Sequence, residues 1–169
     1  MNDLDQTDWL EYVGGNDAAL ERIHFRHQAA LMKYCSYATG SRTRAQDVVQ
    51  ETFLRLMNQR GKLTIKTSLA DWLFICARNL CFSLSKRERT QESVVEGLTE
   101  AATGPDAETA RFIEQVLSKL SVEERDLILL REQQGYSIRE IALLLSVTEE
   151  TVRVRLYRVR KKMQEIGRR

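Results

Sequence analysis

The chain has 169 residues, of which 43% are hydrophobic and 30% are charged, and its formal net charge is +2. This composition is ordinary for a globular protein, and the length allows one medium domain or two small ones. The absence of any run of about 18 apolar residues argues against a membrane-spanning helix. The first residues are acidic, whereas a secretory signal begins with basic residues. We therefore expect a cytoplasmic protein without membrane insertion.

The small net charge hides two basic segments that are separated by acidic ones. Residues 59–90 contain seven Lys or Arg against two Asp or Glu, and residues 153–169 contain eight against one. Between them, residues 91–110 contain five acidic residues and no basic one. Two separate basic segments are typical of a chain that contacts one polyanion at two places. The alternative is that each basic run is only a solvated helix face.

The first 90 residues show helical periodicity, and the period-two alternation of β-strands is absent from the chain. We predict helices over 17–39, 44–58 and 68–86, with a loop over 60–67. In the first of these helices the residues predicted to face inward include Ala19, Leu20, Ile23, Ala30, Leu31 and Tyr34. In the third helix they are Leu69, Trp72, Leu73, Cys76, Ala77, Leu80 and Leu84.

The helix over 44–58 has the clearest division into two faces. Its apolar residues recur at i, i+3, i+4, i+7, i+8 and i+11, which is typical of a helix packed on a core. This stripe consists of Ala45, Val48, Val49, Thr52, Phe53 and Leu56. The opposite side carries a compact polar patch of Asp47, Gln50 and Glu51, which we expect to be exposed.

The segment around residues 91–110 differs from both of its neighbours. It combines its five acidic residues with two glycines and the one proline of the chain, and it lacks sustained apolar periodicity. This composition is typical of a linker. We therefore predict an all-α protein of two small helical domains, residues 1–90 and 109–169, joined by a flexible acidic linker over 91–108.

Helix boundaries are well marked in the second domain. A first amphipathic helix carries Phe112, Ile113, Val116, Leu117 and Leu120. Capping boxes at 121–124 and 137–140 each predict a helix start, and Gly135 lies where the helix opened by the first box should end. A tight turn over 146–148 then leads to a final helix that Thr148 can cap. A short helix, a tight turn and a second helix are the outline of a helix-turn-helix domain.

The final helix divides into a buried arc and a polar face on a helical wheel. The buried arc contains Val152, Leu156, Val159 and Met163. The opposite side carries Glu150, Val154, Tyr157 and Lys161, flanked by Arg153 and Arg158. At the boundary, Arg155, Arg160 and Lys162 can reach phosphates while their stems cover apolar surface. Such a face suits the major groove of DNA, and a helix that is basic only for solubility is the alternative.

Residues that could carry chemistry give only weak signals. The cysteines Cys35, Cys76 and Cys81 lack CxxC spacing and fit small buried residues in a reducing compartment. A zinc site of His24, His27 and Cys35 would lack a clear fourth ligand. No paired carboxylates, Ser/His or Cys/His arrangement, or Gly-rich phosphate loop is present. We therefore expect no catalytic residues, no metal, no cofactor and no enzyme.

Three segments resemble one known family. Residues 133–162, which read QQGYSIREIALLLSVTEETVRVRLYRVRKK, are similar to the promoter-reading domain of extracytoplasmic-function sigma factors, which belong to the sigma-70 superfamily of bacterial RNA polymerase factors. Residues 45–55, AQDVVQETFLR, resemble the family's polymerase-clamp helix. Residues 71–79, DWLFICARN, resemble the helix that melts and reads the −10 element. The resemblance spans about residues 8–163, with the motifs in the family's order.

This resemblance implies a sigma factor that directs promoter-specific initiation, with residues 1–90 similar to region 2 and 109–169 similar to region 4. It implies that the residues bound to the β′ clamp helices of polymerase are Asp47, Gln50 and Glu51. The residues that would capture the −10 strand or hold its backbone are Lys62, Leu63, Thr64, Ile65, Lys66, Thr67, Arg78, Asn79, Lys86, Arg87 and Arg89. Those that would face the −35 element are Thr151, Arg153, Val154, Arg155, Tyr157, Arg158, Lys161 and Lys162.

The implied partners are core RNA polymerase, through its β′ clamp helices and its β flap, together with promoter DNA and an anti-sigma factor. One departure from the family lies in the base-capture loop, because residues 61–71 contain no aromatic residue. Stacking on an aromatic side chain is worth about 1–3 kcal/mol per base, so capture would depend on hydrogen bonds or on Leu63 and Ile65. Asn79 falls beside the edge of the predicted buried stripe, and a structural amide is the alternative to base capture.

A rival hypothesis is a two-domain regulator that binds duplex DNA and a small ligand without polymerase. It would need a ligand pocket within residues 1–90. Co-purification with core polymerase distinguishes the two hypotheses.

Overall fold

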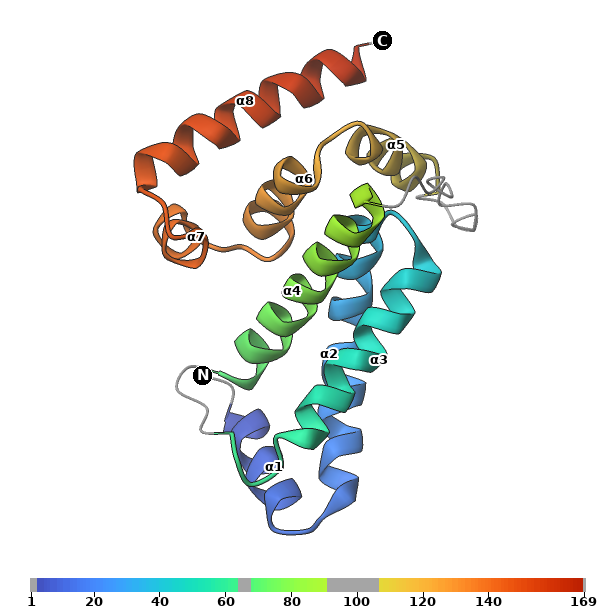
Figure 1. Cartoon of the computed structure of the whole chain (residues 1–169), viewed down its shortest axis with the longest axis vertical. Coiled ribbons are helices and arrows are strands. Elements are labelled where there is room, and N and C mark those ends of the chain that lie inside the picture. The colour runs from blue at the N-terminus through green and yellow to red at the C-terminus, as the bar shows by residue number, and fades with distance from the viewer. Residues whose placement is uncertain (1–2, 64–67, 91–106, 169) are drawn as a thin grey trace. The chain divides into compact units, whose positions relative to one another are not determined.

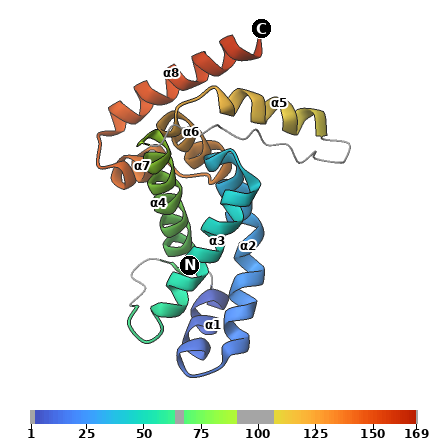
Figure 2. The ribbon, with the colours of Figure 1, turned by 45° about the vertical axis from the view of Figure 1, so that its right-hand side comes forward.

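The computed structural model describes residues 3–63, 68–90 and 107–168, and Figures 1 and 2 show its ribbon from two directions. Every regular element in these ranges is a helix, which confirms the predicted all-α fold class. The chain divides into two compact units, Met1–Val94 and Val95–Arg169. None of the helices in the described ranges combines the length and apolar character that crossing a bilayer requires.

Four helices form the first unit. They are α1 (Asp3–Val13), α2 (Asp17–Thr39), α3 (Arg42–Asn58) and α4 (Leu69–Thr90). Helix α2 is central because it packs against the other three, and α3 and α4 also pack on each other. The unit is therefore a three-helix bundle of α2, α3 and α4, with α1 across the end at which α2 begins (Figure 1).

The turn between α2 and α3 is determined locally. Gly40 lies in the left-handed region at φ 67°, and its N–H donates to the Ser36 carbonyl at 2.9 Å, which ends α2. Ser41 then caps α3, because its hydroxyl accepts the backbone N–H of Arg44 at 3.4 Å. Helix α3 therefore begins at Arg42, two residues before the predicted start.

Packing in the bundle core agrees with the prediction on α3 and differs from it elsewhere. All six residues of the predicted α3 stripe are buried, and the buried Thr52 hydroxyl donates to the Val48 carbonyl at 2.8 Å. On α2 the prediction is wrong for Ala30, which is exposed, and for Leu20, which is half-buried. Periodicity alone overestimates the width of the apolar face of this long helix.

The predicted buried stripe of α4 is rotated relative to the observed one. The buried residues are Leu69, Leu73, Phe74, Ala77 and Cys81. The predicted members that are only half-buried are Trp72, Cys76, Leu80 and Leu84. The difference corresponds to roughly 60° about the helix axis at 100° per residue. It arises because α4 packs against both α2 and α3, and Phe74 meets the Tyr34 ring of α2 edge-on at 4.7 Å.

Helix α1 was not among the predicted helices, because acidic side chains interrupt its apolar pattern. Two of these, Asp5 and Asp8, are buried and pair with basic residues of α2. Asp5 lies 2.8 Å from Arg26 Nε, and Asp8 lies 2.6 Å from Arg22 and also pairs with Arg26. Burial would raise the pKa of Asp8, but hydrogen bonds from Arg26 and Arg22 outweigh it and hold that pKa below its ordinary value.

The second unit contains α5 (Ala107–Ser118), α6 (Val122–Ile128), a short π-helical turn η1 (Leu129–Gln133), α7 (Ile138–Leu145) and α8 (Glu149–Gly167). Both predicted capping boxes are present, with reciprocal hydrogen bonds of 2.8 and 3.2 Å in each. Gly135, at φ 73°, follows η1 as predicted. Thr148 caps α8 by accepting the Thr151 N–H at 3.2 Å. The predicted helix-turn-helix of α7 and α8 is confirmed.

Apolar side chains of every helix meet in the core of this unit. Its fully buried large residues are Leu130, Ile141 and Val152. Phe112 and Ile113, which the sequence assigns to the apolar residues of the amphipathic helix α5, are 50% and 40% exposed. The reason is that α5 packs mainly along α8, where the Phe112 ring approaches the end of that helix at Gly167.

Candidate functional site

The polar patch on α3 lies where the sequence predicts it. Asp47 and Gln50 are exposed, and Glu51 is half-buried. Glu51 is also tied to its own helix, because its Oε1 accepts the Arg55 Nε–H at 2.8 Å. The patch therefore presents two exposed side chains and one that an i,i+4 ion pair holds in place.

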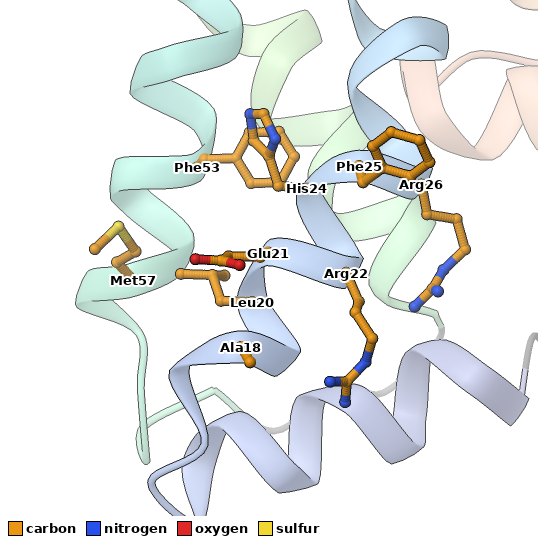
Figure 3. A pocket seen from close by; sticks show the side chains of 9 residues that line it. All are labelled: Ala18, Leu20, Glu21, Arg22, His24, Phe25, Arg26, Phe53 and Met57. Carbon is orange, nitrogen blue, oxygen red and sulfur yellow. The ribbon is translucent and has the colours of Figure 1, made fainter.

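Beside this patch, a groove runs between α2 and α3. We call it the α2–α3 groove and define it by His24 of α2 and by Phe53 and Met57 of α3, which line both of its halves (Figure 3). The half that Figure 3 shows also includes Phe25, which is 86% exposed. The other half includes Leu54, which is 45% exposed, and Gln50 of the polar patch. The groove and the patch therefore form one continuous surface.

The sequence prediction did not include the apolar residues of this groove as functional residues. Leu54 and Met57 are three residues apart on the face of α3 that does not pack on the bundle, and each is 45% exposed. That pattern was visible in the sequence, since neither residue belongs to the predicted buried stripe. Exposed apolar side chains next to polar ones are typical of a protein-binding surface.

The two histidines and Cys35 make separate contacts in the bundle. The His24 ring contacts the Phe53 ring in a tilted arrangement, with 4.5 Å between centroids, and His27 Nε2 lies 3.0 Å from both carboxylate oxygens of Asp5. Cys35 is fully buried. Within the described ranges no group of three His, Cys, Asp or Glu is placed to hold a metal ion.

The start of the predicted base-capture loop is a tight turn. The N–H groups of Lys62 and Leu63 donate to the Gln59 carbonyl at 2.9 and 3.0 Å, and Gly61 adopts φ 72°. Lys62 is exposed, and Leu63 is half-buried. The other predicted loop residues, Thr64, Ile65, Lys66 and Thr67, lie outside the described residues.

Helix α4 carries the other predicted −10 residues. Asn79 and Lys86 are exposed, and Arg78 is half-buried with its guanidinium 4.7 Å from the Phe82 ring centroid. The expectation that Asn79 lies at the core boundary is wrong, because the rotation of the buried arc leaves it on the opposite side of the helix. Its carbonyl accepts the Ser83 hydroxyl at 2.9 Å. Arg87 and Arg89 belong to α4, but their side chains lie outside the described residues.

The burial of the residues along α8 agrees with the prediction from the helical wheel. Val152, Leu156 and Val159 are buried, as predicted, and Met163 is half-buried. Of the residues predicted to face the −35 element, those that are exposed are Arg153, Val154, Arg155, Tyr157, Arg158 and Lys161. Tyr157 is 69% exposed and Val154 is 39% exposed, so an aromatic ring and a branched side chain stand among the bases. Thr151, also predicted for this face, is half-buried beside its cap.

Ion pairs divide the basic residues of α8 into two groups. Lys162 Nζ lies 2.6 Å from Glu124 Oε2, and Arg160 lies 2.7 Å from Glu132. Arg153 pairs with Glu149 of its own helix at 2.9 Å. In the part of the chain that the structure describes, Arg155, Arg158 and Lys161 make no such pair. These last three are therefore the bases most accessible to an external anion.

The Lys162–Glu124 pair joins α8 to the start of α6. Glu124 also closes the first capping box, since its Oε2 accepts the Ser121 N–H at 2.8 Å. Burial would raise the pKa of Glu124, but hydrogen bonds from Lys162 and from the Ser121 backbone outweigh it and lower that pKa. Lys162 is therefore part of the domain's own structure as well as a candidate phosphate contact.

Comparison with known families gives two matches in the chain. The family model described as Sigma-70 region 2 matches residues 25–91, and the one described as Sigma-70, region 4 matches residues 113–163. Helix α1 precedes the first match.

Curated relatives match along nearly the whole chain. The ECF RNA polymerase sigma factor SigL of Mycobacterium tuberculosis (strain ATCC 25618 / H37Rv) is 32% identical, over 89% of this chain and 93% of SigL. The RNA polymerase sigma factor CarQ of Myxococcus xanthus is 23% identical, over 90% of this chain and 91% of CarQ.

Solved structures of similar fold include two complexes. One is CnrH in complex with the cytosolic domain of CnrY, with a TM-score of 0.70 and 25% identity over 97% of each chain. The other is the sigma factor RpoE in complex with the anti-sigma factor NepR from Bartonella quintana, with a TM-score of 0.70 and 22% identity. That match covers 86% of this chain and 94% of RpoE and concerns the fold alone.

Proposed function

This chain belongs to the extracytoplasmic-function sigma factors of the sigma-70 family, and from that premise we propose how its residues divide the work of promoter recognition. It is a promoter-specific transcription initiation factor and not an enzyme, since the polymerase makes the bonds. Residues 1–90 bind the polymerase and the −10 element, residues 109–169 read the −35 element, and residues 91–108 link them. As a polymerase subunit, the protein acts in the cytoplasm.

The observation that carries this proposal is the outer face of α8. A helix that follows a tight helix-turn-helix turn presents Arg158 and Lys161, which form no ion pair within the described ranges, next to exposed Val154 and Tyr157. Arginine can bond a guanine edge in two places, and apolar side chains can contact the thymine methyl group. We assign base contacts to Arg153, Val154, Tyr157 and Arg158. Phosphate contacts fall to the surrounding residues Thr151, Arg155, Lys161 and Lys162.

The −10 contacts are assigned to the outer side of α4 and to the loop after α3. The exposure of Asn79 supports base capture and removes the main argument for a structural amide. Capturing a base from a duplex costs a few kcal/mol of unstacking, and a preformed polar site can offset part of that cost. Lys62 and Leu63 act from the loop with Thr64, Ile65, Lys66 and Thr67, and the backbone is held by Arg78, Lys86, Arg87 and Arg89.

The polymerase contact is assigned to Asp47, Gln50 and Glu51 together with the α2–α3 groove. At such an interface acidic side chains orient the two partners, and exposed apolar side chains such as Leu54 are buried on binding and add to the affinity. The clamp helices of the polymerase β′ subunit are the proposed partner here, and the β flap is the proposed partner of the second unit. An anti-sigma factor is a further proposed partner, as the family resemblance implies, and the similar structure of CnrH is likewise a complex, with the cytosolic domain of CnrY.

Reconstitution with core polymerase tests the proposal. The full chain should retain core polymerase in a pull-down without DNA, and transcripts made from a genomic library should start at sites that share −35 and −10 elements. A ligand-gated regulator would neither retain core polymerase nor direct its start sites.

A double variant tests the clamp assignment. Asp47→Ala with Glu51→Ala should change stability by about 0.5 kcal/mol or less per residue, because these side chains lie off the core, and should weaken core binding. A matched control is Glu149→Ala with Glu150→Ala, which makes the same change of charge in the other unit. Undiminished core binding by the first variant would refute the clamp assignment.

A further inference from the structure

One arginine fixes the turn after α3 against the N-terminal end of the first unit. The Arg60 guanidinium carbon lies 4.4 Å from the centroid of the Tyr12 ring, and Arg60 Nη1 lies 3.0 Å from Asp17 Oδ1. Tyr12 belongs to α1, and Asp17 is the first residue of α2. Arg60 therefore joins three segments, and the ribbon shows the chain leaving α3 beside α1 (Figure 2).

Tyr12 offers Arg60 a fixed partner. Its side chain is only 3% exposed, and its ring lies 5.6 Å from that of Trp9. The turn between α1 and α2 is also close, because a Cβ placed on Gly15 would lie 3.9 Å from Arg60 Nη2. The ion pair with Asp17 is exposed and contributes little by itself, so the buried ring is the main determinant of where Arg60 lies.

The position of Arg60 bears on the loop that follows it. Gly61, at φ 72°, reverses the chain, and the N–H groups of Lys62 and Leu63 both donate to the Gln59 carbonyl. Arg60 lies inside this hydrogen-bonded turn. Because the Arg60 side chain is held in place, the backbone positions of Lys62 and Leu63 are restricted as well.

We propose that Arg60, held by Tyr12 and Asp17, is a positioning residue that directs Lys62 and Leu63 toward the −10 strand. This proposal rests on the −10 role proposed above for the loop. Tyr12 and Asp17 both precede residue 25, where the region 2 match begins. Helix α1 thus contributes to promoter opening in this chain by holding the loop, without touching DNA.

The test compares Arg60→Gln with Arg22→Gln in the full chain. Arg22 also ties α2 to α1, through Asp8 and Glu11 at 2.6 Å each, and both of these partners belong to α1 and not to the turn after α3. In the free protein, amide hydrogen exchange of Lys62 and Leu63 should become roughly two- to five-fold faster in Arg60→Gln, the range expected when an exposed cation–π interaction is removed. The same amides should be unchanged in Arg22→Gln.

Promoter opening with core polymerase gives the second readout. Arg60→Gln should open a linear duplex promoter roughly two- to five-fold more slowly and should act normally on a template already melted at −10. Arg60→Lys, which keeps a cation over the ring, should recover most of the missing rate. Unchanged amide exchange in Arg60→Gln would overturn the positioning role of Arg60. Equal slowing of promoter opening by Arg22→Gln would also overturn it, because the cause would then be a general loosening of α1.

The double variant Lys62→Ala with Leu63→Ala separates this proposal from the one on which it rests. If it slows duplex opening while Arg60→Gln does not, the loop acts on DNA and the positioning role of Arg60 is wrong. If it opens duplex promoters as fast as the wild type, the −10 role of these two loop residues is itself wrong.

Discussion

The two surfaces assigned to DNA are built in different ways. The −35 surface is one face of α8, with its own cap at Thr148 and its buried side on one small core. The −10 surface combines α4 with the turn that contains Arg60, which Tyr12 of α1 and Asp17 of α2 contact from another part of the unit. Periodicity places the first surface correctly, because a helix that packs on one side has one buried arc. It places the second about 60° away, because α4 packs on two helices at once.

The largest effect is expected at the −35 surface of α8. Arg158→Ala removes an exposed arginine that forms no ion pair within the described ranges, so stability should change by about 0.5 kcal/mol or less. Binding to promoters with a guanine opposite Arg158 should weaken by about 1–3 kcal/mol, and binding to promoters without it should weaken less. Arg153→Ala should cost less, because Arg153 must leave Glu149 to reach DNA. The measurement is holoenzyme affinity across a library of −35 sequences, and a uniform loss would make α8 a nonspecific anchor.

A change at the −10 surface should have a smaller effect on promoter opening, and that effect should depend on the template. Asn79→Ala should slow opening of a linear duplex promoter roughly three- to ten-fold, the worth of about one hydrogen bond. A template melted at −10 should be opened normally, because the unstacking cost is already met. The thermal midpoint of the free protein should be unchanged, since Asn79 is exposed. Equal defects on both templates, together with a lowered thermal midpoint, would show that Asn79 supports the fold and does not capture a base.

Local signals in the sequence were sufficient for much of the fold. Both capping boxes, Gly135 and the Thr148 cap act over three or four residues, and each lies where the sequence predicts it. The position of Arg60 could not be predicted, because its partners Tyr12 and Asp17 are distant in sequence. Helix α1 was missed for the same reason, since its carboxylates can be buried only because the arginines of α2 pair with them.

Among the candidate site residues, exposure was easier to predict than pairing. The wheel of α8 separates Val152 from Val154 and Tyr157 correctly. It places Lys161 on the outer face and Lys162 at the boundary, but it does not show that Lys162 meets Glu124, 38 residues away. Long-range ion pairs follow from how helices cross, and periodicity within one helix carries no information about that.

Glu124 tests how far the second unit depends on such a long-range pair. Glu124→Ala removes the capping-box bond and the pair with Lys162 together and should destabilise the unit by about 1 kcal/mol. Glu124→Gln keeps a side chain that can close the box and removes only the charge, so it should cost a few tenths of a kcal/mol. Amide exchange of the buried Leu130 and Val152 in the full chain measures both effects. Equal destabilisation by the two variants would assign the whole effect to the ion pair.

The same residue gives the second unit a dependence on pH. The pKa of Glu124 is lowered on folding, so its charge stabilises the unit above the ordinary glutamate value of 4.5. That stabilisation should disappear as pH falls below 4.5 through the depressed pKa. The protection of the Leu130 amide, expressed relative to its intrinsic exchange rate at each pH, should therefore fall more steeply with acid in the wild type than in Glu124→Gln. Identical slopes would show that Glu124 keeps its ordinary pKa in the folded chain.

The smallest expected effect separates two neighbouring lysines of α8. Removing one lysine–phosphate interaction should reduce the slope of log affinity against log salt by about 0.9 for duplex DNA. Lys161 has no ion-pair partner among the described residues, so Lys161→Ala should reduce the slope by about that amount on every promoter and leave stability unchanged. Lys162 must leave Glu124 to bind a phosphate, so Lys162→Ala should change the slope less and cost a few tenths of a kcal/mol of stability. Salt titrations of holoenzyme binding, with amide exchange at Leu130, measure both. Equal slopes with no change in stability would show that DNA displaces Glu124 freely, and the two lysines would then be equivalent phosphate contacts.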